Sequence, residues 1–119
     1  MITKEEYLKG QTLPEQYEEI MKELLKRLNN FRAEYGKPMI VTSGYRTHEH
    51  NKEIGGSPFS KHCMASACDF ADSDSDIKTF VLNDPDVLAR CGLYMEHPAH
   101  CPRHVHLDIY ERINRIFIP

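Results

Sequence analysis

The sequence predicts an α+β fold in which helices pack on one side of a small antiparallel sheet. Two features indicate this class: a long amphipathic segment near the N-terminus, and several short, largely apolar runs separated by residues that favour turns. The chain has 119 residues, a length that fits one domain with its own core. We therefore expect a single domain over residues 1–119.

The amphipathic segment predicts a helix over residues 12–35. Thr12 and Glu15 form the pattern of a capping box, and Gly36 follows the last periodic residue. The apolar positions recur at intervals of three and four residues, as expected for a helix with one buried face: Tyr17, Ile20, Met21, Leu24, Leu25, Leu28, Phe31 and Tyr35.

The middle of the chain alternates strands with a long connection. Residues 39–43 and 67–71 are short and mostly apolar, which predicts two strands. Residues 44–61 are rich in Gly, Ser, His and Asn, which predicts a loop, and loops of this length are usually functional.

The second half predicts two short helices and a hairpin. The acidic run 72–76 leads into a helix over 77–82, and a further helical turn covers 85–90. Residues 92–96 and 104–110 read as two strands joined by a wide loop.

Composition excludes several classes of partner. The net charge is −3 and no basic block is present, which argues against nucleic acid. No apolar run approaches the ~20 residues of a membrane span, so we expect no membrane partner. The N-terminal MITKEEYLKG lacks the apolar core of a signal peptide, so we expect cytoplasmic synthesis without an export signal. We also expect a monomer.

Histidines are concentrated in one part of the chain. Five of the seven lie between residues 62 and 106. Catalytic zinc takes three protein ligands and leaves a fourth position open, and the candidate ligands are His62, Asp69 and His106. Asp69 lies in an apolar strand, where a carboxylate needs a partner.

The hairpin suggests a role for Glu96. If the loop spans 97–103, Glu96 lies opposite His104 and Tyr94 lies opposite His106, so Glu96 shares a face with His106. A register shift of one residue would turn Glu96 away.

Several motifs resemble the family of zinc D-Ala-D-Ala carboxypeptidases and L-alanyl-D-glutamate peptidases, which share a hedgehog-like fold. The resemblance covers about residues 38–110. The residues that carry it are Ser43-Gly44-Tyr45-Arg46, Asn51, Gly55-Gly56, Ser60-Lys61-His62, Ala67, Asp69 and His104-Val105-His106-Leu107-Asp108.

The resemblance implies zinc as the cofactor and His62, Asp69 and His106 as its ligands. It implies that Arg46 binds a substrate carboxylate or stabilises the oxyanion, since its planar fork meets paired oxygens. It implies that Ser60 hydrogen-bonds the substrate.

The chain departs from the family pattern at two positions. Ala65 stands where relatives commonly have Gly, and Arg103 stands where many have the catalytic carboxylate. Glu96 and His104 are then the candidates for the catalytic base, and we favour Glu96 because a carboxylate readily relays a proton to the leaving amine. Asp108 either hydrogen-bonds a ligating histidine or faces solvent.

The resemblance therefore implies zinc-dependent hydrolysis of a peptide bond in peptidoglycan, as a D,D-carboxypeptidase or an L-alanyl-D-glutamate endopeptidase. Together with the missing export signal, it suggests an endolysin, a phage or prophage lysis enzyme that reaches the cell wall after release. A non-catalytic zinc-binding module of the same fold is the alternative. A structural zinc site formed by the four cysteines is a weaker alternative because their spacing is irregular: Cys63, Cys68, Cys91 and Cys101. We expect these cysteines to be reduced thiols, although two disulfides are also possible.

Overall fold

The computed structural model describes residues 1–119 and contains a five-stranded mixed sheet with the order β1-β2-β4-β3-β5. The strands are β1 Val41–Ser43, β2 Ala67–Ala71, β3 Tyr94–Glu96, β4 His104–Asp108 and β5 Ile116–Phe117. The first four pair antiparallel, as the sequence predicted. The edge strand β5 pairs parallel to β3 and was not predicted, since its two residues are too short for a periodic signal.

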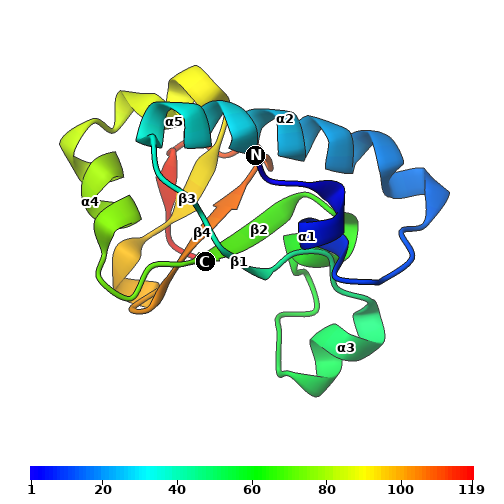
Figure 1. The fold of residues 1–119 in the computed structure, drawn as a ribbon. Coiled ribbons are helices and arrows are strands. Elements are labelled where there is room, and N and C mark those ends of the chain that lie inside the picture. The colour runs from blue at the N-terminus through cyan, green and yellow to red at the C-terminus, as the bar shows by residue number, and fades with distance from the viewer.

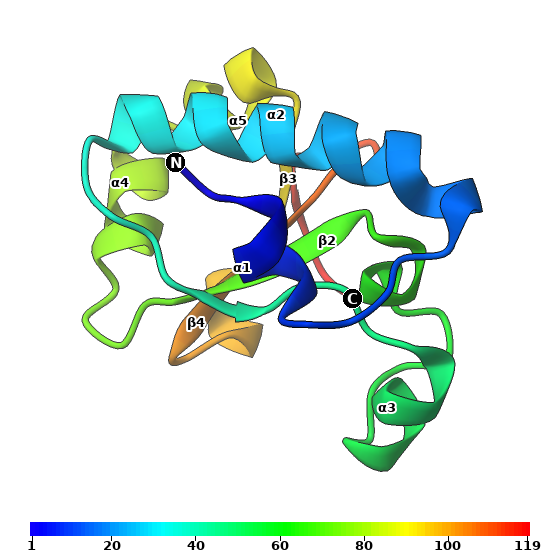
Figure 2. The same ribbon diagram turned by 45° about the vertical axis from the view of Figure 1, so that its right-hand side comes forward.

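Helices form a layer on one face of this sheet (Figure 1). The helical elements are α1 Lys4–Leu8, η1 Glu15–Tyr17, α2 Glu18–Tyr35, α3 His48–Glu53, η2 Lys61–Met64, α4 Asp76–Asn83, α5 Asp86–Cys91 and η3 Pro98–His100. Figure 2 shows α2 extending across the sheet, with α3 projecting away from this body. None of these helices has the length and apolar character needed to span a bilayer.

Side-chain alternation in β2 and β4 gives the sheet two different faces. Cys68 and Phe70 of β2, with Val105 and Leu107 of β4, are buried in the core beneath the helices. The residues between them must point the other way, because successive side chains of a strand alternate. The opposite face therefore carries polar side chains and is free of the helix layer.

The helix α2 supplies much of the core. Met21, Leu24, Leu28 and Phe31 are buried at the spacing that the sequence predicted. Truncating a buried aromatic such as Phe31 to alanine typically costs about 3–5 kcal/mol of stability. The α-helix begins at Glu18, so the prediction that it starts at residue 12 was wrong.

The N-terminal region differs from the prediction in how its helices begin. The chain enters α2 through the 3-10 turn η1, and no side chain caps either start. The capping box of the structure lies earlier, where Thr3 and Glu6 begin the short helix α1. The predicted end is correct, because Gly36 adopts φ 79° and closes α2.

The hairpin register differs from the predicted one by two residues. Tyr94 pairs with Asp108, and Met95 pairs with Leu107. The same register places the next residue, Glu96, opposite His106 instead of His104. A shift of two residues keeps every side chain on its face. Glu96 therefore still lies on the face that carries His106.

The acidic run before α4 acts as its cap. The Asp72 carboxylate accepts hydrogen bonds from the backbone N–H groups of Ile77 and Lys78. The buried Lys78 ammonium contacts Asp72 at 2.9 Å and donates to the carbonyl of His104. This pair connects the start of α4 to the start of β4, next to the polar face.

Candidate metal centre

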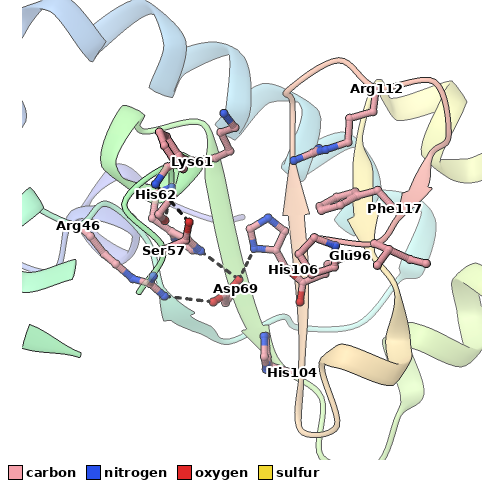
Figure 3. A pocket seen from close by; sticks show the side chains of 14 residues that line it. Arg46, Ser57, Lys61, His62, Asp69, Glu96, His104, His106, Arg112 and Phe117 are labelled. Atoms are coloured by element: carbon pink, nitrogen blue, oxygen red, sulfur yellow. Dashed lines mark hydrogen bonds and ion pairs between the residues drawn. The ribbon is translucent and has the colours of Figure 1, made fainter. Parts of the chain in front are cut away.

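Three side chains converge on the polar face of the sheet. The ligand atoms of His62, Asp69 and His106 all lie within 4.8 Å of one another, and no other group of three His, Cys, Asp or Glu side chains does so. Asp69 Oδ1 lies 3.2 Å from His62 Nε2 and 2.9 Å from His106 Nδ1 (Figure 3). The structure thus brings together the three residues that the sequence singled out.

Local structure places each of the three. Asp69 and His106 are direct cross-strand partners in the centre of β2 and β4. His62 lies in η2, whose first turn is capped by the Ser60 hydroxyl accepting from the His62 backbone N–H. Two strands and one capped turn therefore fix the cluster.

Outer hydrogen bonds select which nitrogen each histidine presents to the centre. His62 Nδ1 lies 2.8 Å from the Gly44 carbonyl, and His106 Nε2 lies 2.8 Å from Asp108 Oδ2. With an N–H at those positions, His62 Nε2 and His106 Nδ1 are the nitrogens left to offer a lone pair to a metal. Asp108 is fully buried and contacts a candidate ligand, so of the two roles left open for it the solvent-facing one is wrong.

Gly44 is required for this arrangement. A Cβ at Gly44 would meet the Tyr7 carbonyl oxygen, an impossible approach of 2.0 Å. Only glycine lets this backbone pass so close to α1 while its carbonyl faces His62.

The charges of the cluster stabilise one another. Burial alone would raise the pKa of Asp69, but hydrogen bonds and charge from His106 and His62 hold it well below the ordinary range. Burial alone would lower the pKa of His106, but hydrogen bonds from its ring to Asp108 and Asp69 outweigh this and raise it to about 9. Without a metal, a proton thus occupies the centre.

The donor set fits zinc. Two zinc–ligand bonds of about 2.0–2.1 Å at a tetrahedral angle place their donor atoms roughly 3.3 Å apart. The two distances from Asp69 Oδ1, 3.2 and 2.9 Å, are close to that spacing. Two imidazoles and one carboxylate with an open side are also the usual donors of a catalytic zinc site.

Arg46 lies beside the cluster and is held on three sides. Its Nε donates to Ser43 Oγ at 3.0 Å, its Nη1 to Asn51 Oδ1 at 3.2 Å, and its Nη2 lies 3.5 Å from Asp69 Oδ2. A guanidinium has five N–H donors, so one remains on each terminal nitrogen. Arg46 can therefore still donate from both terminal nitrogens to an anionic group.

The cluster opens into a pocket of about 440 Å³. Glu96 and His104, the two candidate bases, both line it, and so do Arg46 and Ser60. Arg103 is exposed and does not line the pocket.

The structure also places the remaining histidines, the four cysteines and Ala65. The exposed histidines His48, His50, His97 and His100 do not line the pocket. Cys63, Cys68, Cys91 and Cys101 are buried free thiols and form no metal-ligand group, so the structural zinc site made of cysteines is wrong. Ala65 adopts φ 57°, the left-handed conformation that favours glycine.

Three supporting residues were given no role at this site from the sequence, although Asn51 is among the residues that carry the family resemblance. Asn51 fixes both Arg46 and the loop, since its amide also donates to the Ser57 carbonyl at 2.7 Å. Arg112 donates to both oxygens of Asp108 and lies over the Phe117 ring. Cys101 donates to Glu96. Asn51 lies in the short helix α3, whereas Cys101 and Arg112 lie in connections between elements. No periodic pattern marks a residue in a connection, because its position depends on the path of the folded chain.

Comparison with protein-family models gives a match. A family model described as Peptidase M15 matches residues 2–108, nearly the whole chain. The comparison with curated proteins gives no match. The matched range contains the three residues of the cluster. It also contains Arg46, Glu96 and His104, and it ends before Arg112.

Proposed function

The chain belongs to the peptidase M15 family, and from this premise we propose that it is a zinc-dependent peptidase that hydrolyses a peptide bond next to a D-amino acid in peptidoglycan. One observation carries the proposal: the His62, Asp69 and His106 donors adjoin a pocket that also holds a fixed arginine and a carboxylate. A purely structural zinc site is closed by four protein ligands, whereas this one has three. We propose that the single domain 1–119 carries the whole site.

The metal would be held by His62 Nε2, His106 Nδ1 and an Asp69 oxygen. Bound zinc acts as a Lewis acid and makes water nucleophilic at neutral pH. Gly44 and Asp108 orient the two imidazoles, and such outer partners raise the basicity of ligating histidines.

Arg46 would stabilise negative charge on the substrate. Its guanidinium is already fixed by Ser43, Asn51 and Asp69, so its position changes little as the reaction proceeds. The two free N–H donors can meet an oxyanion or a terminal carboxylate. Ser60 lies at the pocket wall and would offer its hydroxyl to the substrate backbone.

Glu96 would move the proton. It takes a proton from the attacking water as the new C–O bond forms, and it gives that proton to the leaving nitrogen as the C–N bond breaks. One water is consumed, and the products are a carboxylate and an amine. His104 lines the same pocket and is the alternative base or a further donor to the oxyanion.

The substrate we propose is a peptidoglycan stem peptide, cut at D-Ala-D-Ala or at L-Ala-D-Glu. Both bonds lie close to carboxylates, which suits a pocket lined by the cations Arg46, Lys61 and Arg112. We propose a phage or prophage lysis role as the setting, because a small domain that carries the complete site is sufficient for such an enzyme. This role is tested by whether the purified protein clears suspensions of permeabilised cells.

The test of the activity is release of new amino groups from purified peptidoglycan. We expect the release of amino groups to stop when a chelator is added and to return when zinc is restored. The newly exposed terminal residues then identify the peptide bond that is cut. Zinc bound at one ion per chain with no release would instead support the non-catalytic zinc-binding module.

A further inference from the structure

The carboxylate of Glu96 has one hydrogen-bond partner in the protein, the thiol of Cys101. Cys101 Sγ lies 2.8 Å from Glu96 Oε2, a close approach for sulfur. The other oxygen, Oε1, makes no hydrogen bond to the protein. One oxygen of the pair is therefore fixed, while the other has no hydrogen-bond partner in the protein, and the residue lines the pocket.

The chain path between β3 and β4 creates this contact. Glu96 ends β3, and η3 turns the chain immediately afterwards, with the His97 ring accepting from the Ala99 N–H. Cys101 follows η3, and its backbone N–H donates to the Pro98 carbonyl at 3.0 Å. This tight turn returns the thiol to the carboxylate five residues earlier.

The environment keeps the thiol protonated. Cys101 is 1% exposed. Burial, followed by the hydrogen bond with Glu96, raises the pKa of Cys101 to about 12. A thiol with this pKa donates a hydrogen bond at neutral pH and is inert as a nucleophile or metal ligand.

We propose that Cys101 is a positioning residue that holds the Glu96 carboxylate in the orientation needed for proton transfer. This inference rests on the proposed function, in which Glu96 is the base. A thiol is a weak donor, so it can fix the direction of the carboxylate without forming a strong charge-assisted hydrogen bond. A hydroxyl would stabilise the charged form more strongly.

Substitutions at Cys101 give an ordered series. We expect Cys101→Ala to lower kcat about tenfold with KM unchanged, because a freely rotating carboxylate is seldom aimed correctly. The acidic limb of the pH–kcat profile should move to higher pH in Cys101→Ala. In Cys101→Ser it should move to lower pH, with kcat at the plateau largely retained. A role in stability alone would lower the melting temperature without producing this order.

A matched control exists at another thiol–carboxylate pair. Cys91 is also buried and contacts Glu34 at 3.5 Å, on the helix side of the molecule. Cys91→Ala should leave kcat and the acidic limb unchanged.

A spectroscopic readout tests the contact without activity. The infrared S–H stretching band of Cys101, assigned by subtracting the Cys101→Ala spectrum, should lie at the low frequency of a strongly bonded thiol. It should move to higher frequency in Glu96→Gln. A band at the position of a free thiol that Glu96→Gln does not move would overturn the inference.

The two hypotheses fail in different ways. Full activity of Glu96→Gln would reject Glu96 as the base and with it the proposed mechanism. An inactive Glu96→Gln together with a Cys101→Ala variant that matches wild type in kcat and acidic limb would reject only the role of Cys101. In the Glu96→Gln background, Cys101→Ala should cause no further loss.

Discussion

Zinc and a proton should compete for one nitrogen of His106. In the metal-free protein both ring nitrogens lie at carboxylates, Nδ1 at Asp69 and Nε2 at Asp108. Both can donate only if the imidazole is protonated. Zinc bound at the proposed site would use the Nδ1 lone pair, so that proton would have to leave as the metal binds. The apparent zinc affinity should therefore rise with pH.

The size of the effect follows from the pKa of His106, about 9. At pH 7, roughly one molecule in a hundred has Nδ1 free of its proton. The apparent affinity should rise about tenfold from pH 7 to 8, gain roughly 100-fold in total as pH rises well past 9, and then level off. About one proton should be released per zinc at pH 7.

A substitution at Asp108 should weaken this dependence. Asp108→Asn removes one of the two carboxylates that raise the pKa of His106, and Arg112 then lies nearby without its counter-charge. The pKa of His106 should fall towards its ordinary value, and the gain in affinity between pH 7 and 9 should shrink to about tenfold or less. The exposed Asp74, substituted to Asn, is the control for loss of one negative charge.

The assay is competition with a chromophoric zinc chelator at each pH, combined with calorimetry in two buffers to count released protons. Circular dichroism confirms that each variant is folded. A zinc affinity that stays flat from pH 7 to 9 would show that zinc does not displace a proton from His106. So would an Asp108→Asn profile identical to that of wild type.

Three further predictions concern stability and activity. The pKa of His106 is raised on folding to about 9, so this residue should add roughly 3 kcal/mol to the free energy of unfolding of the metal-free protein. This contribution should be complete below pH 6.5 and lost as pH rises through about 9. Urea unfolding in the presence of a chelator at several pH values measures it. Glu96→Gln should lower kcat about 10²–10⁴-fold in peptide hydrolysis assays, with zinc affinity unchanged. The exposed Glu111→Gln should leave kcat unchanged. Equal effects of the two substitutions would reject Glu96 as the base. Arg46→Lys should lower kcat/KM at least about tenfold, because a lysine ammonium cannot replace the planar guanidinium group. The exposed Arg103→Lys should retain wild-type kcat/KM. Wild-type kcat/KM in both variants would contradict the role of Arg46.

Periodicity explains what the sequence predicted well. The spacing of Leu24, Leu28 and Phe31 identified the buried face of α2, and the apolar run at 67–71 gave the bounds of β2. Alternation also explains why the candidate site was predictable. Asp69 and His106 had to lie on the face opposite the core, whatever the exact register.

Features that depend on chain paths were not predictable. The hairpin register was wrong by two residues because the 3-10 turn η3 sets the length of the loop. Arg112 and Cys101 reach the site from connections, and a sequence pattern does not give the direction in which a connection turns. The predicted start of α2 was wrong because the sequence at Thr12 matches a capping box, but in the structure no side chain caps η1.

We propose that His62, Asp69 and His106 hold a zinc ion at an open catalytic position. Anomalous diffraction at the zinc edge from crystals grown with zinc tests it most directly. We expect one peak bound by His62 Nε2, His106 Nδ1 and an Asp69 oxygen, with a fourth position facing the pocket that contains Glu96. A peak at any other group, or zinc bound through His106 Nε2 with Asp108 displaced, would contradict it.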